Sequence, residues 1–259
     1  MKNLNYISIL LIILLLPLQN SHAGQNVIAD SVKSTVSFNY GMSFVSKAVW
    51  RGLESGSTPT SGAAPQIQPS AAIKYNFNQE DYIDFTLWGS FGIKGNYNEY
   101  NFILTYTKST SIGHFSFSVI DYYFPFMKIP FSNFSGQGKG AHTIEAGITY
   151  TAPEYFPISI FAANNIHNDL PGDNSFYIEL SHPFHIADFE MNAFIGGAAG
   201  KSAWYLINSD KFEVCNIGIK GTRNIRFSDR IHIPVTFGLI HNPYLKDSFF
   251  LFKVAISRF

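Results

Sequence analysis

The sequence predicts an antiparallel β-barrel of twelve strands that crosses a membrane, and three observations carry this prediction. The first is the alternation in residues 66–77, where Ile67, Ile73, Tyr75 and Phe77 share one phase and mostly polar or small residues share the other. Successive side chains on a strand point to opposite faces, so this segment has one apolar and one polar side. It is also close in length to the ~9–11 residues that a tilted strand needs to cross a bilayer.

Composition is the second observation. Aromatic residues make up 16% of the 259-residue chain and charged residues only 14%, whereas soluble domains carry about 25% charged residues. Lysine plus arginine and aspartate plus glutamate both number 18, so the net charge is zero and no nucleic-acid partner is indicated. Low charge with many aromatics favours a β protein that faces lipid. A soluble β-sandwich is the alternative.

The third observation is that the alternating unit recurs along the chain. We expect twelve strands, at residues 36–51, 66–77, 83–94, 99–106, 115–119, 143–150, 157–163, 176–181, 189–195, 215–220, 231–239 and 250–257. The longest connections, 52–65, 124–140, 164–174 and 196–211, all follow odd-numbered strands. Even strand numbers, long outer loops and short periplasmic turns are typical of outer-membrane barrels. Both termini of the meander are therefore expected in the periplasm. The connections 95–98 and 221–229 are exceptions, one short on the outer side and one long on the inner side.

Residues 1–23 have the features of a secretory signal peptide. Lys2 gives a positive start, residues 7–18 form an apolar core, and residues 21–23 fit a small-residue cleavage pattern. A retained membrane helix is the alternative, disfavoured because the apolar run is short. Residues 24–35 are then a periplasmic lead-in and residues 36–259 the barrel.

We expect neither a disulfide nor a membrane-spanning helix in the mature chain. Cys215 is its single cysteine, so no internal disulfide can form. After residue 23 no apolar run reaches the roughly 18–20 residues of a membrane helix. A membrane location therefore requires a closed barrel, because only helices and barrels satisfy their backbone hydrogen bonds in lipid.

Charged residues follow the polar phase of the predicted strands. A charge on the lipid face near the midplane costs up to about 2–4 kcal/mol, so we expect charges to line the lumen. The predicted pore-lining residues are Lys47, Arg51, Lys74, Asp84, Lys94, Glu99, Glu145, Glu179, Glu190, Lys220 and Lys253. Arg51 is the best candidate for a constriction or a key pair in the lumen. Asp121 and Glu213 fall on the opposite phase, at expected outer ends where a bulge or solvent can accommodate them.

Aromatic residues on the apolar phase gather at the ends of the predicted strands. Such girdles mark the two water interfaces of a membrane barrel. The predicted girdle residues are Trp50, Tyr75, Phe77, Tyr100, Tyr106 and Tyr150.

Three groups of short motifs resemble one family. They are residues 45–52 (VSKAVWRG), which end in aromatic-Arg-Gly, residues 67–70 (IQPS), and the series 98–99 (NE), 121–125 (DYYFP) and 175–179 (SFYIE). Together they resemble the TorF-like porin family of proteobacterial outer-membrane proteins, over most of the mature chain. The resemblance implies an outer-membrane barrel with a pore role, no catalytic residues and no defined substrate.

The terminal Phe259 resembles the aromatic residue with which outer-membrane barrels engage the barrel assembly machinery. Phe259 is in phase with Ser257 and not with Ile256, so a terminal bulge or fray is needed for it to face lipid.

The functional prediction is an outer-membrane channel for passive diffusion of small hydrophilic solutes or ions, with outer-membrane lipid as its surroundings. Mixed charges could instead seal the lumen, because eight strands leave a filled interior and sixteen or more an open channel. A non-conducting barrel with a structural or adhesive role through its outer loops is thus an alternative. We expect no cofactor.

An enzyme is the third possibility and is not expected. A lipid hydrolase would need serine, histidine and an orienting asparagine or aspartate together, and no Ser–His pairing stands out near His142. Residues 182–185 (HPFH) could ligate a metal but lie in an expected turn without further ligands. The Asn/Asp-rich segment 164–174 lacks the spacing of a calcium loop. We therefore predict no catalytic and no metal site.

Overall fold

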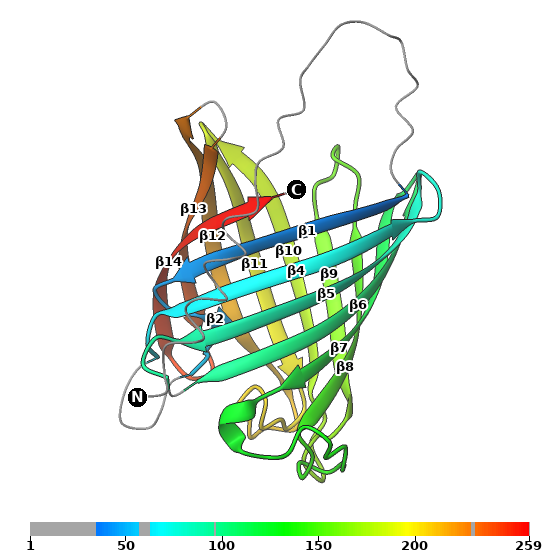
Figure 1. The fold of residues 1–259 in the computed structure, drawn as a ribbon. Coiled ribbons are helices and arrows are strands. Elements are labelled where there is room, and N and C mark those ends of the chain that lie inside the picture. The colour runs from blue at the N-terminus through cyan, green and yellow to red at the C-terminus, as the bar shows by residue number, and fades with distance from the viewer. Residues whose placement is uncertain (1–34, 57–62, 96, 229–230, 259) are drawn as a thin grey trace, which may run out of the picture. The chain divides into compact units, whose positions relative to one another are not determined.

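The structure is a computed structural model that describes residues 35–56, 63–95, 97–228 and 231–258. Within these ranges, twelve antiparallel strands close into a barrel in which β1 pairs with both β14 and β4 (Figure 1). The barrel strands are β1 (Val36–Val45), β4 (Gln66–Asn76), β5 (Asp81–Gly92), β6 (Asn98–Thr110), β7 (Gly113–Tyr123), β8 (His142–Thr151), β9 (Ser159–His167), β10 (Phe176–Ile186), β11 (Phe189–Ala199), β12 (Phe212–Ser228), β13 (Ile231–Asn242) and β14 (Asp247–Arg258). The predicted twelve-stranded antiparallel barrel is confirmed. The predicted signal peptide, most of the lead-in and Phe259 lie outside the described residues.

The connections divide by length between the two ends of the barrel. One end, here called the loop end, carries residues 46–65, 124–141, 168–175 and 200–211, together with the shorter 93–97 and 243–246. The other, the turn end, carries residues 77–80, 111–112, 152–158 and 187–188, and there β1 begins and β14 ends (Figure 1). The long connection expected at 221–229 is wrong, because β12 continues to Ser228 and is paired with β13 from Ile217 to Ser228, with one irregularity between Arg226 and Ser228.

Several other boundaries differ from the sequence prediction, and three of them matter for the connections and the site. The strand expected at 36–51 ends at Val45, and a separate hairpin follows, made of β2 (Val49–Trp50) and β3 (Leu53–Glu54). Strand β9 extends to His167, into the segment expected to be a polar loop. Strand β10 extends to Ile186, so residues 182–185 lie in a strand and not in a turn. In the loop 124–141 a short 3-10 helix, η1, covers Pro125–Met127.

Three prolines lie inside barrel strands, and their positions explain why the missing N–H groups are tolerated. Pro183 pairs with β11, but the ladder between β10 and β9 has already ended at Ser181. Pro69 lies where the β4–β5 ladder is interrupted, and Pro234 lies beyond the last β13–β14 pair. Each proline therefore sits where the ladder lapses on one side, which is where a strand accepts proline.

The two faces of the wall differ in polarity as the alternation predicts. Large apolar side chains on the outer face remain solvent-accessible, among them Phe38, Met42, Ile73, Leu104, Phe117, Ile148, Leu180, Ile217 and Leu239. Polar residues of the opposite phase are buried or half-buried inside, including Gln66, Ser90, Asn101 and Glu145. An exposed apolar surface that continues around a barrel marks contact with lipid or another apolar partner. Within the described ranges, no helix has the length and apolar character needed to cross a membrane.

A β-bulge brings Glu213 into the barrel. Gly196 pairs with Asn216 and Gly197 with Val214, so Cys215 is an extra residue on β12. Glu213 then lies opposite Ala198, which is fully buried. Cys215 itself is buried in a cluster with Tyr177 and Tyr205. The bulge, which the sequence analysis allowed for, resolves the phase of Glu213, and it also turns Cys215 inward.

Asp121 does face outward, and it is paired there with His142. The Nδ1 atom of His142 lies 2.9 and 3.0 Å from the two carboxylate oxygens of Asp121, and its Nε2 atom lies 2.6 Å from the carbonyl oxygen of Phe131. Phe134 stacks on the imidazole at 4.0 Å between centroids, and His142 is fully buried. The loop 124–141 thus covers this polar pair on the outer wall, which removes the cost of an exposed carboxylate at the edge of the apolar surface.

Candidate functional site

The hairpin 49–54, here called the lumen hairpin, folds into the barrel. Arg51 and Gly52 form its two-residue turn with φ values of 49° and 81°, and positive φ at both positions is the signature of the type I′ turn. Glycine is required at the second position because a Cβ atom there would collide with the backbone carbonyl of Cys215 on β12. The Arg-Gly pair therefore allows the hairpin tip to touch the inner wall.

Arg51 ties the hairpin tip to the far side of the barrel. Its Nη1 and Nη2 atoms donate to the two carboxylate oxygens of Glu145 on β8, at 2.6 and 2.8 Å. In the order of strands around the wall, β8 is five steps from β1 in one direction and seven in the other. Nη1 also donates to the hydroxyl oxygen of Tyr205 at 2.5 Å, and the Nδ2 atom of Asn242 on β13 donates to the carbonyl oxygen of Gly52 at 3.1 Å. The hairpin therefore crosses the lumen.

Aromatic rings enclose the guanidinium group of Arg51. Its Cζ atom lies 4.5 Å from the ring centroid of Trp50, 4.7 Å from that of Tyr177 and 4.9 Å from that of Phe161. Trp50 stacks almost parallel on Tyr205, with centroids 5.5 Å apart. Cation–π contacts of this kind are worth up to about 2 kcal/mol when desolvated. Arg51 is thus held by charge, hydrogen bonds and stacking together.

The charge state of Arg51 follows from this surrounding. Burial alone would lower the pKa of Arg51, but the neighbouring Tyr205 and the Glu145 carboxylate outweigh burial and raise it above its ordinary value. Burial is also the main reason that the pKa of Tyr205 is raised. Arg51 therefore stays positively charged and Tyr205 stays a neutral hydroxyl at any ordinary pH.

Glu145 accepts a further hydrogen bond, and a second carboxylate of the lumen, that of Glu179, also has hydrogen-bond donors. The hydroxyl of Tyr122 donates to Glu145 at 3.2 Å. Glu179 accepts from the hydroxyl of Tyr177 at 2.6 Å and from the Nδ2 atom of Asn216 at 2.8 Å. The carboxylates on this side of the lumen are therefore held in fixed positions.

On the other side of the hairpin a cavity of about 580 Å³ remains inside the barrel. Its wall residues come from β1, β4, β5, β6, β7, β12, β13 and β14, and the loop residues Trp204 and Leu206 also border it. Two lysines, Lys220 and Lys253, line it together with Glu99 and Asn101. The ion pair between Lys47 and Glu54 lies at its margin. This size falls within the ~300–1,000 Å³ of typical small-molecule sites.

Most of the predicted pore-lining residues lie along the inside of the wall, but Lys47 and Arg51 belong to the chain that leaves the wall after Val45, and Lys94 lies outside the strands. Lys74 and Asp84 lie opposite each other on β4 and β5, and Glu190 is exposed near the turn end. Lys94 was expected to continue the polar phase of its strand. Strand β5 instead ends at Gly92, so Lys94 lies in an exposed turn at the loop end.

The predicted girdle residues lie on the outer face, except for Trp50. Tyr75 packs edge-on against Phe77, which contacts Tyr106; Tyr150 contacts Phe115 near the same turn end, and Tyr100 packs against Phe91 and Tyr123 nearer the loop end. Trp50 was assigned to this girdle wrongly. The chain leaves the wall after Val45, so the alternation of β1 does not extend to it, and it packs in the lumen against Tyr122, Trp204 and Tyr205.

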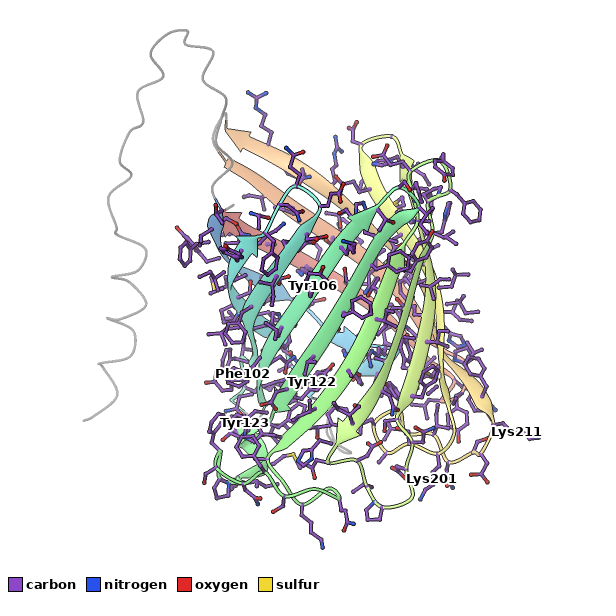
Figure 2. All side chains as sticks on the ribbon, turned by 90° about the vertical axis from the view of Figure 1, so that its right-hand side faces the viewer. Phe102, Tyr106, Tyr122, Tyr123, Lys201 and Lys211 are labelled. Atoms are coloured by element: carbon purple, nitrogen blue, oxygen red, sulfur yellow. The ribbon has the colours of Figure 1, made fainter. Side chains whose placement is uncertain are left out.

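Several residues of the site were missed by sequence reasoning. Figure 2 places Tyr122 beside Tyr123 towards the loop end, while Tyr106 lies further along the wall. Tyr122 and Tyr177 are aromatic residues on a polar phase, and that mismatch was the available signal. Tyr205 carried no such signal, because it comes from a loop, between Lys201 and Lys211.

The pair of His142 and Asp121 has the donor set of a catalytic dyad but not its geometry. In a serine hydrolase the second imidazole nitrogen faces the nucleophile. Here the Nε2 atom of His142 is bonded to the carbonyl oxygen of Phe131, and three aromatic rings pack on the imidazole. The arrangement leaves no position for a serine hydroxyl at that nitrogen.

Fold and interior together define a barrel that is apolar outside and polar inside, with its lumen narrowed by an internal hairpin. Comparison with known proteins gave no matching family model and no match among curated proteins, so the resemblance to the TorF-like family stays a prediction. Among solved structures, the chain is similar to a KdgM porin in complex with disordered oligogalacturonate, with 8% identity, a TM-score of 0.46, and coverage of 86% of this chain and 98% of that one. It is also similar to CdiB from Acinetobacter baumannii, with 9% identity, a TM-score of 0.35, and coverage of 86% of this chain and 60% of that one.

Proposed function

We propose that this protein is a porin-like channel of a bacterial outer membrane, through which small hydrophilic solutes diffuse passively. The observation that carries the proposal is the contrast between the apolar outer face and a lumen that holds charged residues and a cavity of about 580 Å³. Lipid on the outside and water inside satisfy both faces, because a closed barrel leaves no strand edge unpaired. Export by a cleaved signal peptide and insertion by the barrel assembly machinery through the last strand complete the proposal.

The lumen hairpin sets the expected size of the channel. Since it crosses from β1 to β8, solutes pass beside it, along the cavity lined by β1, β4–β7 and β12–β14. The channel is therefore narrower than an unobstructed twelve-stranded barrel. Its walls carry both signs of charge, so we expect modest discrimination between chloride and potassium.

Planar lipid bilayers test the proposal directly. The refolded protein should insert and give stepwise currents in 1 M KCl, smaller than those of a variant in which residues 47–56 are replaced by a short Gly/Ser linker. Inserted protein that stays electrically silent, both as wild type and in the linker variant, would reject a channel.

A second function is favoured by the strength of the hairpin anchorage. The buried pair of Arg51 and Glu145 has side chains only 10% and 1% exposed, and such a plug could keep the barrel shut. The protein would then be a non-conducting barrel that acts through its long outer loops. In the bilayer experiment this alternative gives current only for the linker variant.

A further inference from the structure

Two unpaired amines face the cavity from one side of the barrel. Lys220 on β12 and Lys253 on β14 both line it, from the strands on either side of β13, where Lys220 pairs with Gly238 and Lys253 with Thr236. Among the ion pairs of the described residues, none involves either amine. Lys220 lies over the ring of Phe194, with its Nζ atom 5.1 Å from the ring centroid. Glu179 attracts Lys220 but does not form an ion pair with it. Two like charges on a partly buried wall, neither of them in an ion pair, leave room for an anionic ligand group.

Hydrogen-bond acceptors face the same cavity from β6. Glu99 is 8% exposed and accepts from the hydroxyl of Tyr97 at 2.5 Å. Asn101 is equally buried, and its Oδ1 atom has no hydrogen-bond partner. A buried carbonyl oxygen without a donor costs about 1–3 kcal/mol, which a bound donor would recover. In the wall, β6 is four strands from β14.

We propose that this cavity binds small zwitterions, with amino acids as the chemical class. The carboxylate end of the ligand lies towards Lys220 and Lys253, and its ammonium end towards Glu99 and Asn101. Each end forms charge-assisted hydrogen bonds, which are about twice as strong as neutral ones. The proposal deepens the proposed function by naming a solute class, and it rests on that function for its role in transport.

The tryptophans supply a direct binding assay. All three tryptophans of the chain, Trp50, Trp88 and Trp204, border the cavity, so their fluorescence should report a ligand in the detergent-folded protein. The probes are 4-aminobutyrate, butyrate and butylammonium, which share a four-carbon chain and differ in whether they carry the carboxylate, the ammonium group or both. We expect 4-aminobutyrate to bind about tenfold or more tightly than either singly charged probe, because it gains a second charge-assisted contact. Equal affinities, or no response to 4-aminobutyrate, would overturn the proposal.

Matched variants separate the two ends of the site. Lys253→Gln should weaken binding of 4-aminobutyrate and butyrate but not of butylammonium. Glu99→Gln, which can keep the Tyr97 hydrogen bond, should weaken 4-aminobutyrate and butylammonium but not butyrate. Lys139→Gln, which removes a charge from the exposed part of the loop 124–141, is the control and should change none of them. Uniform weakening across all three probes indicates misfolding of a variant, and loss of the crossed pattern in both folded variants contradicts the site.

Binding and conduction fail independently. If the protein binds 4-aminobutyrate with the crossed pattern but carries no current, the binding site is supported and the channel is rejected. If the protein conducts but shows no preference for 4-aminobutyrate, the channel is supported and the binding site is rejected.

Discussion

Glu145→Gln is the sharpest perturbation of the lumen hairpin, because it removes one charge and almost no volume. It leaves the guanidinium of Arg51 buried opposite a neutral amide, in place of two charge-assisted bonds at 2.6 and 2.8 Å. Breaking one side of a buried ion pair costs about 3–5 kcal/mol. At 1.4 kcal/mol for each factor of ten, the equilibrium between anchored and released hairpin shifts by roughly two to three and a half powers of ten.

Single-channel recording in planar bilayers measures the consequence. The variant should show larger or more frequent openings than the wild type, and residues 49–54 should exchange their amide hydrogens faster. Glu190→Gln is the matched control, since it removes the same charge from the exposed turn end of the wall. The double variant Arg51→Gln/Glu145→Gln should recover part of the anchored state, because no charge is left unpaired. Wild-type currents and wild-type exchange in Glu145→Gln would refute the anchoring role.

Four other predictions follow from single features. Gly52→Val should release the hairpin tip, since the side chain collides with the wall and the positive φ costs about 1–2 kcal/mol; acrylamide quenching of tryptophan should increase. Ile73→Lys should lower the free energy of unfolding in lipid vesicles by up to about 2–4 kcal/mol, measured in urea, because the residue faces outward. His142→Gln should lower the same quantity by about 1–3 kcal/mol and expose the loop 124–141 to protease, because Asp121 loses its partner. Cys215, fully buried, should react with a water-soluble maleimide only after unfolding.

Controls for these variants come from the same chain. Gly95→Ala places a side chain at a comparable positive φ but in open space, so it isolates backbone strain from collision. Ile73→Leu keeps the apolar surface and should leave the unfolding free energy within about 1.5 kcal/mol of wild type. An unchanged urea midpoint for Ile73→Lys would contradict a lipid-facing position. A protease pattern identical to wild type would contradict the role given to His142, and rapid labelling of the folded protein would contradict the burial of Cys215.

The wall of the barrel could be predicted from sequence because its information is local. Alternation with period two assigns each residue of β4 or β5 to a face without any knowledge of its partners, and loop lengths orient the meander. The prediction failed where polarity changed along a strand that kept its hydrogen bonds. In β12, the polar residues after Gly221 continue the ladder beyond the apolar belt, so their sequence was interpreted as a turn.

The site could be predicted only in part, because it is assembled from segments that are distant in the chain. Arg51 was identified by its motif, but its partner Glu145 lies 94 residues away and Tyr205 lies 154 away. The phase of residues 46–50 matches that of β1, so no local signal shows that the chain leaves the wall after Val45. The pairing of Asp121 with His142 depends on the register of β7 against β8, which alternation does not specify.

The attachment of the lumen hairpin has a mechanical consequence. The hairpin acts as a crossbar that is bonded to β8 through Glu145 and to β13 through Asn242, so it holds these two parts of the circumference at a set separation. The width of the lumen and the stiffness of the barrel wall therefore depend on the same contacts. Any substitution that widens the passage by detaching the crossbar should also yield a softer, more easily deformed cylinder.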